Sequence, residues 1–217
     1  MIPKLIHQIY GIFDDNKKLE DIPPFKKHQA ITKKFCNDYK YKYKLWSLKD
    51  CELLLCEFYP EYIDLWNHFR FPIQRADFIR YLILHKYGGF YIDLDVSPMK
   101  DLTPLLEHES VFTTWESDKH KKPYNAVMAS IPNNNLFKSI CDECEKRTYQ
   151  KQSMAIYDIW KGRLVFHTTG HFMLAKVIPK QIIKNLMYVE NPLKDIYDKA
   201  EDAYFYDSNI SSWFNSL

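Results

Sequence analysis

The chain has 217 residues, of which 46% are hydrophobic and 27% charged, proportions typical of a globular protein with a buried core. A formal net charge of +2 gives no reason to expect a nucleic-acid partner. No stretch approaches about eighteen consecutive apolar residues, and the N-terminus resembles neither a signal peptide nor an anchor. We therefore expect no transmembrane anchor and a cytoplasmic location, either soluble or peripheral to a membrane. The five cysteines then favour reduced thiols, and their spacing argues against a zinc site.

The chain begins with alternating strand-like and helix-like segments. The apolar run Lys4–Tyr10, which stops at Gly11, predicts a buried first strand. A helix is expected over Phe25–Tyr39. The alternation of polar and apolar residues in Tyr41–Trp46 predicts a second strand.

Two further helices have recognisable starts. Ser47 is a good N-cap because Asp50 follows three residues later, and that helix should run to about Phe58. A second helix is predicted over Pro72–Tyr87, because Pro72 suits its first turn and Gly88 suits its C-terminal end.

The remaining elements continue the alternation. Phe90–Val96 is expected to be a strand that ends near Pro98. Further strands are predicted at Val111–Trp115 and Leu164–Thr168, and further helices at Asn135–Tyr149 and His171–Ile178. No repeat or Gly/Ser-rich linker interrupts the pattern, so residues 1–217 are interpreted as a single domain. The alternation predicts a three-layer α/β/α fold with a mostly parallel sheet. The tail 203–217 has no clear period and is a candidate for closing over a site.

Two acidic residues lie close together at the end of the apolar run 90–96. In a strand, side chains alternate between faces, so Tyr91, Asp93 and Asp95 should share one face. Two ionised carboxylates on one face repel each other, and a divalent cation beside them removes the conflict. Hard oxygen ligands favour Mg²⁺ or Mn²⁺.

The preceding helix offers a second charged pair. Asp77 and Arg80 are three residues apart and therefore neighbours on one helical face. They form either a simple surface ion pair or part of a binding site. In such a site Asp77 would accept hydrogen bonds from sugar hydroxyls, and Arg80 would contact the phosphate or sugar of a sugar-phosphate donor.

Together these residues resemble a known family. Arg75-Ala76-Asp77-x-x-Arg80-Tyr81, followed by Gly88-Gly89-x-Tyr91-x-Asp93-x-Asp95, is similar to the sugar-binding region of DXD-containing glycosyltransferases of the family 32 type. The relatives include yeast-type initiating mannosyltransferases, bacterial capsule transferases of polysaccharide biosynthesis and the glucosylating domain of large clostridial toxins. The resemblance implies a GT-A fold, a Rossmann-like nucleotide-diphospho-sugar transferase domain.

The resemblance extends to other segments. Ile9 and Tyr10 resemble the end of the family's opening strand, which implies that Tyr10 stacks on the donor base. Asn125 begins a segment similar to the one that lines the sugar pocket. Ser212 and Trp213 resemble the closing Ser-Trp whose tryptophan covers the donor phosphates. Thr169 and Gly170 resemble a family turn in which His171 replaces the usual proline.

By this resemblance the protein is a metal-dependent hexosyltransferase that uses a UDP-sugar by preference, retains the anomeric configuration and acts on a glycan or other hydroxyl acceptor. Arg75 and Tyr91 are assigned to donor binding. Asp93 would meet the ribose and metal-bound water, and Asp95 would bind Mn²⁺ or Mg²⁺ directly. A histidine usual near the end of the family is missing, so the third protein ligand is expected among residues 207–212, with Asp207 and Asn209 as candidates. An inverting enzyme would instead need a general base, for which the candidates are Asp207, Glu116, Asp118 and His171.

Two alternatives stay open. The first is a sugar-nucleotide-binding module without turnover, which would bind donor with Mn²⁺ but neither transfer nor hydrolyse it. The second is a haloacid-dehalogenase-type phosphatase that uses Asp93 as nucleophile. The mechanism of such a phosphatase gives no role to the residues around Asp77. A phosphatase of this type would hydrolyse a generic aryl phosphate.

Overall fold

The computed structural model describes residues 1–13, 18–114, 122–184, 186–189 and 203–208. Its centre is a six-stranded sheet with the strand order β2-β1-β3-β6-β5-β7. The strands are β1 (Leu5–Ile9), β2 (Lys42–Trp46), β3 (Gly89–Ile92), β5 (Ser110–Thr113), β6 (Tyr124–Ser130) and β7 (Ile183–Lys184). Strand β1 is parallel to β2 and β3, and β5 is parallel to β7, whereas β6 is antiparallel to both of its neighbours. The predicted mostly parallel α/β sheet is confirmed, with β6 as the strand that runs the other way.

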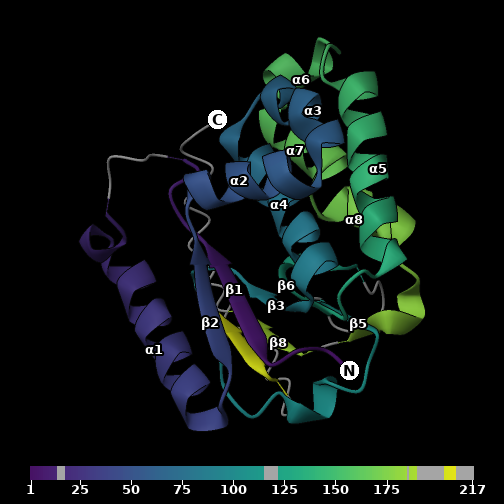
Figure 1. Cartoon of the computed structure of the whole chain (residues 1–217). Helices are drawn as coiled ribbons and strands as arrows, with labels where there is room; N and C mark the ends of the chain where they lie inside the picture. The colour runs from purple at the N-terminus through teal and green to yellow at the C-terminus, as the bar shows by residue number, and fades with distance from the viewer. Residues whose placement is uncertain (14–17, 115–121, 185, 190–202, 209–217) are drawn as a thin grey trace.

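One face of the sheet is covered by a layer of helices (Figure 1). They are α2 (Leu48–Phe58), α3 (Ile63–His68), α4 (Pro72–Tyr87), α5 (Asn135–Lys151), α6 (Ile156–Ile159), α7 (Lys161–Thr168) and α8 (His171–Val177). Short 3₁₀ turns occur at Leu19–Asp21, Pro60–Tyr62, Thr103–Leu105 and Lys180–Ile182. No helix in the described part of the chain combines the length and the hydrophobicity that crossing a membrane requires.

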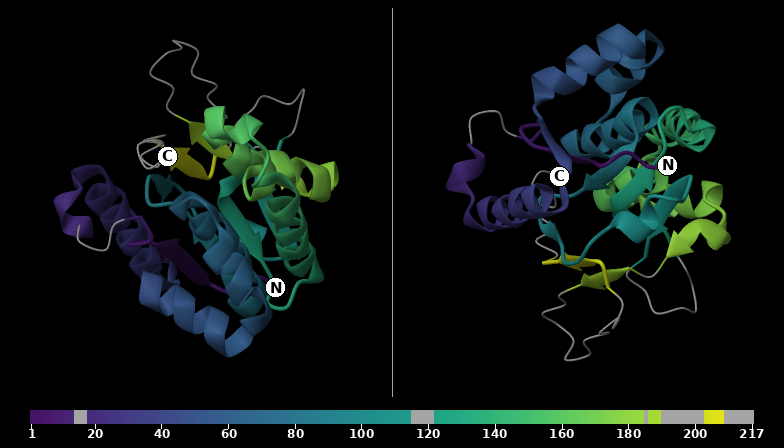
Figure 2. Two further views of the ribbon diagram at one scale, coloured as in Figure 1. Left: turned by 90° about the horizontal axis from the view of Figure 1, so that it is seen from above. Right: turned by 60° about the horizontal axis from the view of Figure 1, so that its bottom comes forward.

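The opposite face is covered by α1 (Pro23–Tyr39) and a second, three-stranded sheet, as Figure 2 shows. The strand order in this small sheet is β4 (Val96–Pro98), β9 (Phe205–Asp207) and β8 (Met187–Val189). The third layer is thus one long helix together with a small sheet. It brings β9 beside β4, the strand that follows β3 in the chain.

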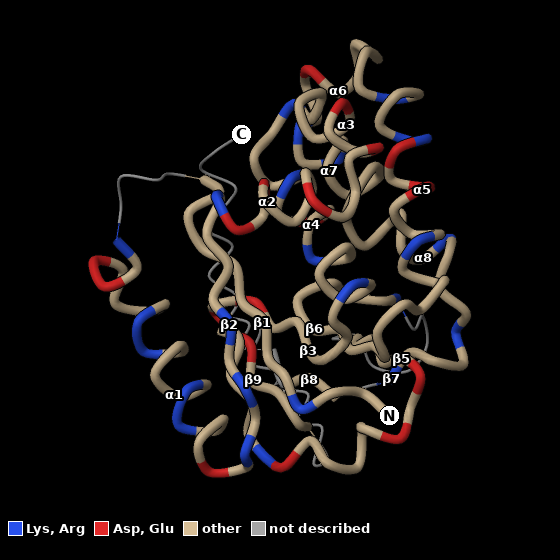
Figure 3. The backbone as a smooth tube through the Cα atoms, viewed as in Figure 1, with Lys and Arg blue, Asp and Glu red and all other residues tan. Residues whose placement is uncertain are grey.

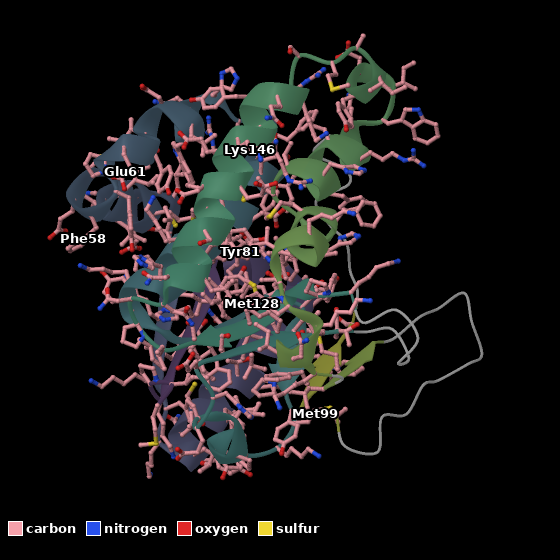
Figure 4. All side chains as sticks on the ribbon, turned by 90° about the vertical axis from the view of Figure 1, so that its right-hand side faces the viewer. Phe58, Glu61, Tyr81, Met99, Met128 and Lys146 are labelled. Carbon is pink, nitrogen blue, oxygen red and sulfur yellow. The ribbon has the colours of Figure 1, made fainter. Side chains whose placement is uncertain are left out.

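Each face of the central sheet has its own hydrophobic core. In β3, Phe90 and Ile92 pack with α1 and the small sheet, while Tyr91 between them packs with the helical layer. This is the alternation expected of a strand buried on both faces. Figure 4 shows Tyr81 of α4 and Met128 of β6 in the interior between the helices and the sheet. The residues on either side of Tyr91 therefore have opposite surroundings, which matters for the site described below.

Local sequence signals explain the starts of two helices. At the start of α2, Ser47 Oγ accepts a hydrogen bond from the Asp50 N–H at 3.2 Å, and the Asp50 carboxylate accepts one from the Ser47 N–H at 2.9 Å. This capping box satisfies two N–H groups that have no partner within the helix. Helix α4 begins at Pro72 and ends at Tyr87, as predicted.

Two strand predictions are wrong. Leu164–Thr168 lies in helix α7, where Leu164, Val165 and Thr168 point into the core with the spacing of one helical face. A short apolar run does not distinguish a strand from a buried helix. The strand predicted at Phe90–Val96 ends at Ile92, because the Val96 N–H donates to the Asp93 carbonyl at 3.1 Å and closes a turn. Val96 then enters the small sheet. Strand β6 and the small sheet were not predicted.

The turn from α4 into β3 requires two glycines. Gly88 and Gly89 have φ angles of 62° and 86°, which side-chain-bearing residues rarely adopt. A Cβ at Gly89 would lie 2.5 Å from the carbonyl oxygen of Leu5 in the neighbouring strand β1. The absence of a side chain thus allows β3 to pair closely with β1 immediately after the helix.

We therefore expect Gly89→Ala to lower the free energy of unfolding by more than about 2 kcal/mol, since it adds backbone strain to a steric clash with β1. Urea denaturation followed by circular dichroism measures the effect. Gly162→Ala, in α7 and without a positive φ angle, is the matched control and should change stability by less than about 1 kcal/mol. Equal stability of the two variants would contradict this account of the turn.

Candidate functional site

The centre of the candidate site is a buried guanidinium group, that of Arg80. One of its terminal nitrogens lies 3.2 Å from Asp77 Oδ1, and the other lies 3.1 Å from Asp93 Oδ1. The same group donates to the main-chain carbonyls of Asn125, at 2.8 Å, and Ala76, at 3.1 Å. Arg80 and Asp77 are each only 4% exposed, so they do not form a surface ion pair. The pair predicted from helical spacing exists, and it is linked to a carboxylate from the end of β3.

The aromatic ring of Tyr91 packs against the guanidinium of Arg80. The ring centroid of Tyr91 lies 4.6 Å from the central carbon of the Arg80 guanidinium, a favourable cation–π distance. The Tyr91 hydroxyl donates to Asp93 Oδ1 at 2.6 Å. Burial raises the pKa of this phenol well above its usual value, and the neighbouring Arg80 opposes that shift. Asp93 is therefore held by Arg80 and Tyr91 together, while its side chain remains 28% exposed.

Asp77 lies deeper and is surrounded by donors. The Asn125 side-chain amide donates to its Oδ1 at 2.8 Å, and the Thr169 hydroxyl donates to its Oδ2 at 3.0 Å. Burial raises the pKa of Asp77 to about 6, although Arg80 and the two hydrogen bonds act in the opposite direction. Tyr81 adds a further link by donating to the Thr169 carbonyl at 2.6 Å. The network thus joins α4, β6 and the connection between α7 and α8.

The turn after β3 carries the second aspartate. Asp95 follows the strand rather than belonging to it, so strand alternation does not place Asp93 and Asp95 on one face. The main-chain carbonyl of Asp95 accepts hydrogen bonds from both the N–H and the hydroxyl of Ser208, at 3.1 and 3.0 Å. Asp207 is paired with Val96 in the small sheet and is buried. The start of the C-terminal tail is therefore fixed against the Asp-x-Asp turn.

Three acidic residues act electrostatically on Tyr124. Burial raises the pKa of the Tyr124 phenol, and Asp207, Asp93 and Asp95 raise it further, in that order. The sequence gives no indication of a functional role for Tyr124, because a tyrosine at the start of a strand belongs to no recognisable motif.

The acidic residues suit a hard divalent cation only in part. Carboxylate oxygens are the preferred ligands of Mg²⁺ and Mn²⁺. Within the described residues, however, no three His, Cys, Asp or Glu side chains are grouped closely enough to hold a metal ion. The acidic candidates from the sequence within the described residues are Asp93, Asp95 and Asp207, of which Asp93 also contacts Arg80 and Tyr91. The sequence candidate Asn209 lies outside the described residues.

A chain of hydrogen bonds holds the main chain of the Asp-x-Asp turn, and the sequence patterns did not indicate it. The Gln8 side-chain amide donates to the Asp93 carbonyl at 3.2 Å, and its oxygen accepts from the Tyr43 hydroxyl at 2.9 Å. Gln29 of α1 donates to the same hydroxyl at 3.1 Å. These residues come from β1, β2 and α1, so their joint role depends on the tertiary structure.

The remaining donor-site candidates are distributed around this centre. Ile9 and Tyr10 end β1 at the same sheet edge as Asp93, because β1 and β3 are parallel. Ile9 is buried and Tyr10 is half-buried. The guanidinium of Arg75 instead lies over the ring of Trp66 in α3, at 5.5 Å, and donates to the Trp66 carbonyl at 3.1 Å.

Several other candidates are placed less directly. Ser212, Trp213, Glu116 and Asp118 lie outside the described residues. His171 begins α8, with its ring 4.5 Å from that of Phe166. His7 is buried between the Gly88 carbonyl, at 2.9 Å, and the Trp46 indole N–H, at 3.1 Å, and burial lowers its pKa to about 4. It is therefore a neutral, hydrogen-bonded histidine of the core.

Comparison with known proteins places these residues in context. Residues 9–112 match the family described as "Glycosyltransferase sugar-binding region containing DXD motif". The chain is 37% identical over 142 residues to the mannosyl phosphorylinositol ceramide synthase SUR1 of Saccharomyces cerevisiae, a match that covers 63% of this chain and 33% of the relative. It is 30% identical over 220 residues to CSH1, a synthase of the same name from that yeast, with 98% of this chain and 53% of the relative covered. The chain thus spans between a third and about half of these relatives.

A solved structure shares the fold. The PaToxG glycosyltransferase superposes with a TM-score of 0.51 at 17% sequence identity, over 83% of this chain and 70% of that one. At this level of identity the match speaks for the fold alone. The architecture is therefore the GT-A type that the sequence predicts.

The raised pKa of Asp77 has a consequence for stability. Between about pH 4 and 6 the folded state keeps a proton on Asp77 that the unfolded state releases, so this proton stabilises the fold at low pH and is lost as the pH rises through about 6. We expect the stability of the wild type relative to Asp77→Asn to fall by about 2–3 kcal/mol across this range. Urea denaturation of both proteins at a series of pH values measures the difference.

Asp64→Asn, at an exposed position in α3, is the matched control and should follow the pH dependence of the wild type. If Asp77→Asn followed it as well, the buried carboxyl would not titrate as described.

Proposed function

We propose that this protein transfers a hexose from a nucleotide-diphosphate sugar to a hydroxyl acceptor, because residues 9–112 match the DXD-containing sugar-binding region of a glycosyltransferase family. The observation that supports this best is the arrangement around Arg80. One buried cation holds Asp77 and Asp93 at the carboxyl edge of a parallel strand pair, where ligands bind in open α/β sheets. Asp95 follows two residues after Asp93 and is half-buried.

The network suggests a role for the buried polar residues in binding the sugar. Because the Asn125 amide nitrogen donates to Asp77, its carbonyl oxygen must point elsewhere. That oxygen is then an acceptor for a sugar hydroxyl, and Asp77 acts by fixing its orientation. Asp77 also accepts from Thr169, so a carboxyl in the interior positions two elements that border the site.

Asp93, Asp95 and Asp207 are assigned to the diphosphate side. In our proposal Asp95 and Asp207 would hold Mn²⁺ or Mg²⁺, and Asp93 would lie towards the ribose of the donor. The cation supplies stabilisation of the negative charge that develops on the leaving diphosphate. The chain's own contribution is to keep Asp93 in place through Arg80 and Tyr91, and to fix the Asp95 main chain through Ser208.

The identity of the donor is a further part of the proposal. The names of both yeast relatives refer to mannosyl transfer, which favours mannose as the sugar. Ile9 and Tyr10 at the end of β1 favour uracil as the base, by the resemblance of this segment to uracil-stacking members. Transfer is proposed to proceed with retention, and the acceptor to be a glycan or another hydroxyl compound.

A panel of UDP- and GDP-linked hexoses, with and without Mn²⁺, tests these assignments. Donor hydrolysis and thermal shift are the measurements, and proton NMR of the product reports the anomeric configuration. We expect one donor to be hydrolysed in a Mn²⁺-dependent manner. Hydrolysis of none of them, combined with Mn²⁺-dependent thermal stabilisation, would instead show a binding module without turnover. A phosphatase is disfavoured, because Arg80 and Tyr91 engage the carboxylate that would have to act as its nucleophile.

We expect Asp95→Asn to lower Mn²⁺-dependent turnover at least about 100-fold, because an amide replaces the anionic ligand of the cation. The thermal unfolding temperature should be nearly unchanged, since the substitution keeps the main-chain carbonyl that accepts both hydrogen bonds from Ser208. Initial rates of donor hydrolysis measure the effect. Asp64→Asn, which removes one exposed carboxylate from α3, should retain wild-type rates. Wild-type activity in Asp95→Asn would refute the proposed metal-binding role.

A further inference from the structure

A second unusual surface lies at the end of the helical layer, outside the aspartate cluster. Around the one-turn helix α6, four large apolar side chains point outward, with exposed fractions of 46% for Met154, 51% for Ile156, 79% for Ile159 and 49% for Trp160. We call these four residues the apolar tip. Large apolar side chains that are exposed next to one another mark an interaction surface more often than isolated ones do.

The tip is held rigidly enough to present these side chains. Tyr157, in the middle of α6, is buried and directed towards α7, where its ring lies 6.4 Å from that of His167. At one side of α6, Asp158 is bound by Arg70 at 2.6 Å. Burying Tyr157 therefore fixes the short helix in the orientation that exposes its other apolar residues.

The tip lies at an extremity of the molecule. In Figure 1 helix α6 is at the top of the helical layer. Such a projecting surface differs from the groove or flat face that usually accommodates a protein partner. It suits insertion into a deformable surface such as a lipid bilayer.

The charges around the tip are mostly basic. Residues 146–163 contain five Lys or Arg and a single acidic residue, Asp158, which is paired with Arg70; of the five basic residues, Lys146 and Arg147 are paired with Glu143. Lys151, Lys161 and Arg163 directly flank the apolar residues, and the Arg163 guanidinium lies 4.7 Å from the Trp160 ring. Figure 3 shows basic positions along this end of α5. The surface that accompanies the apolar side chains is thus positively charged.

We propose that the apolar tip docks this protein on an anionic lipid surface. Apolar side chains with a tryptophan among them enter the interfacial region of a bilayer, and neighbouring Lys and Arg residues are attracted to anionic headgroups. Self-association fits these charges less well, because a symmetric contact through the tip would bring the same basic residues of two copies together. The proposal concerns a surface independent of the donor site.

Co-sedimentation with vesicles tests the proposal on the full chain. We expect binding to vesicles that contain about 30% phosphatidylserine, at least about tenfold weaker binding to pure phosphatidylcholine vesicles, and release as salt is raised to about 0.5 M. The double variant Ile159→Ser/Trp160→Ser should lose binding about tenfold or more, since it removes the most exposed apolar group and the interfacial aromatic ring. Lys161→Gln/Arg163→Gln should weaken binding to anionic vesicles by about fivefold per charge and leave binding to neutral vesicles unchanged.

The matched control is Leu53→Ser/Met99→Ser, which removes two apolar side chains that are 56% and 57% exposed elsewhere on the surface. It should bind vesicles as the wild type does. Because all substituted residues are exposed, thermal unfolding of every variant should remain close to the wild type. Trp160→Phe should keep vesicle binding but reduce the blue shift of tryptophan emission that accompanies it.

Three outcomes would overturn the proposal: no binding of the wild type to anionic vesicles, equal losses in the tip variant and the control, or a wild-type dimer in gel filtration that the tip variant dissociates. The last result would identify the tip as a contact between copies of this chain. Failure of vesicle binding leaves the donor-hydrolysis experiments unaffected, so the two proposals are judged separately.

Discussion

The structure of the candidate site depends on one buried cation. Arg80 has Asp77 and Asp93 on two sides and Tyr91 against its face. Burial lowers the pKa of this guanidinium, but Asp93, Tyr91 and Asp77 raise it by more, so the group stays charged. Removing one partner of such a buried arrangement typically costs about 3–5 kcal/mol, because the remaining charges lose their compensation. Helix α4 and the end of β3 are therefore fixed relative to each other by electrostatics as well as by packing.

The same constraint explains how the chain connects its parts. The two glycines after α4 return the chain into β3 at once, so that Arg80 and Asp93, thirteen residues apart, face each other. The antiparallel strand β6 then brings Asn125 to Asp77, and the small sheet brings Asp207 and Ser208 beside the turn that carries Asp95. Polar groups become more exposed from Asp77 outward to Asp93. This gradient suits a site that orients a neutral sugar in its interior and receives a charged diphosphate near its rim.

The two surfaces for which we propose functions depart in opposite ways from the usual distribution of polar and apolar side chains. The donor site buries ionisable side chains, which is costly unless they are paired, whereas the tip around α6 exposes large apolar side chains to water. Neither arrangement is required by the architecture of the sheet and its helices. Departures of this kind tend to occur where a protein binds something, because the ligand or surface supplies the missing partner.

The sequence by itself determined the fold class and most of the helices, and it singled out Asp77, Arg80 and Asp93, which the structure brings into contact. Periodicity and capping located α1, α2, α4 and α5 because these signals depend on near neighbours in the chain, and the spacing of Asp77 and Arg80 placed them on one helical face. The sequence could not distinguish α7 from a strand, since a five-residue apolar run suits either when it is buried. It also extended β3 through the Asp-x-Asp segment, where a turn ends the strand. Only the tertiary structure decided that Arg80 pairs with Asp93, that Gln8 and Tyr43 hold the main chain of that turn, and that Asp207 lies beside it. These contacts join residues that are distant in sequence, and their energies arise only after the sheet has brought the strand ends together.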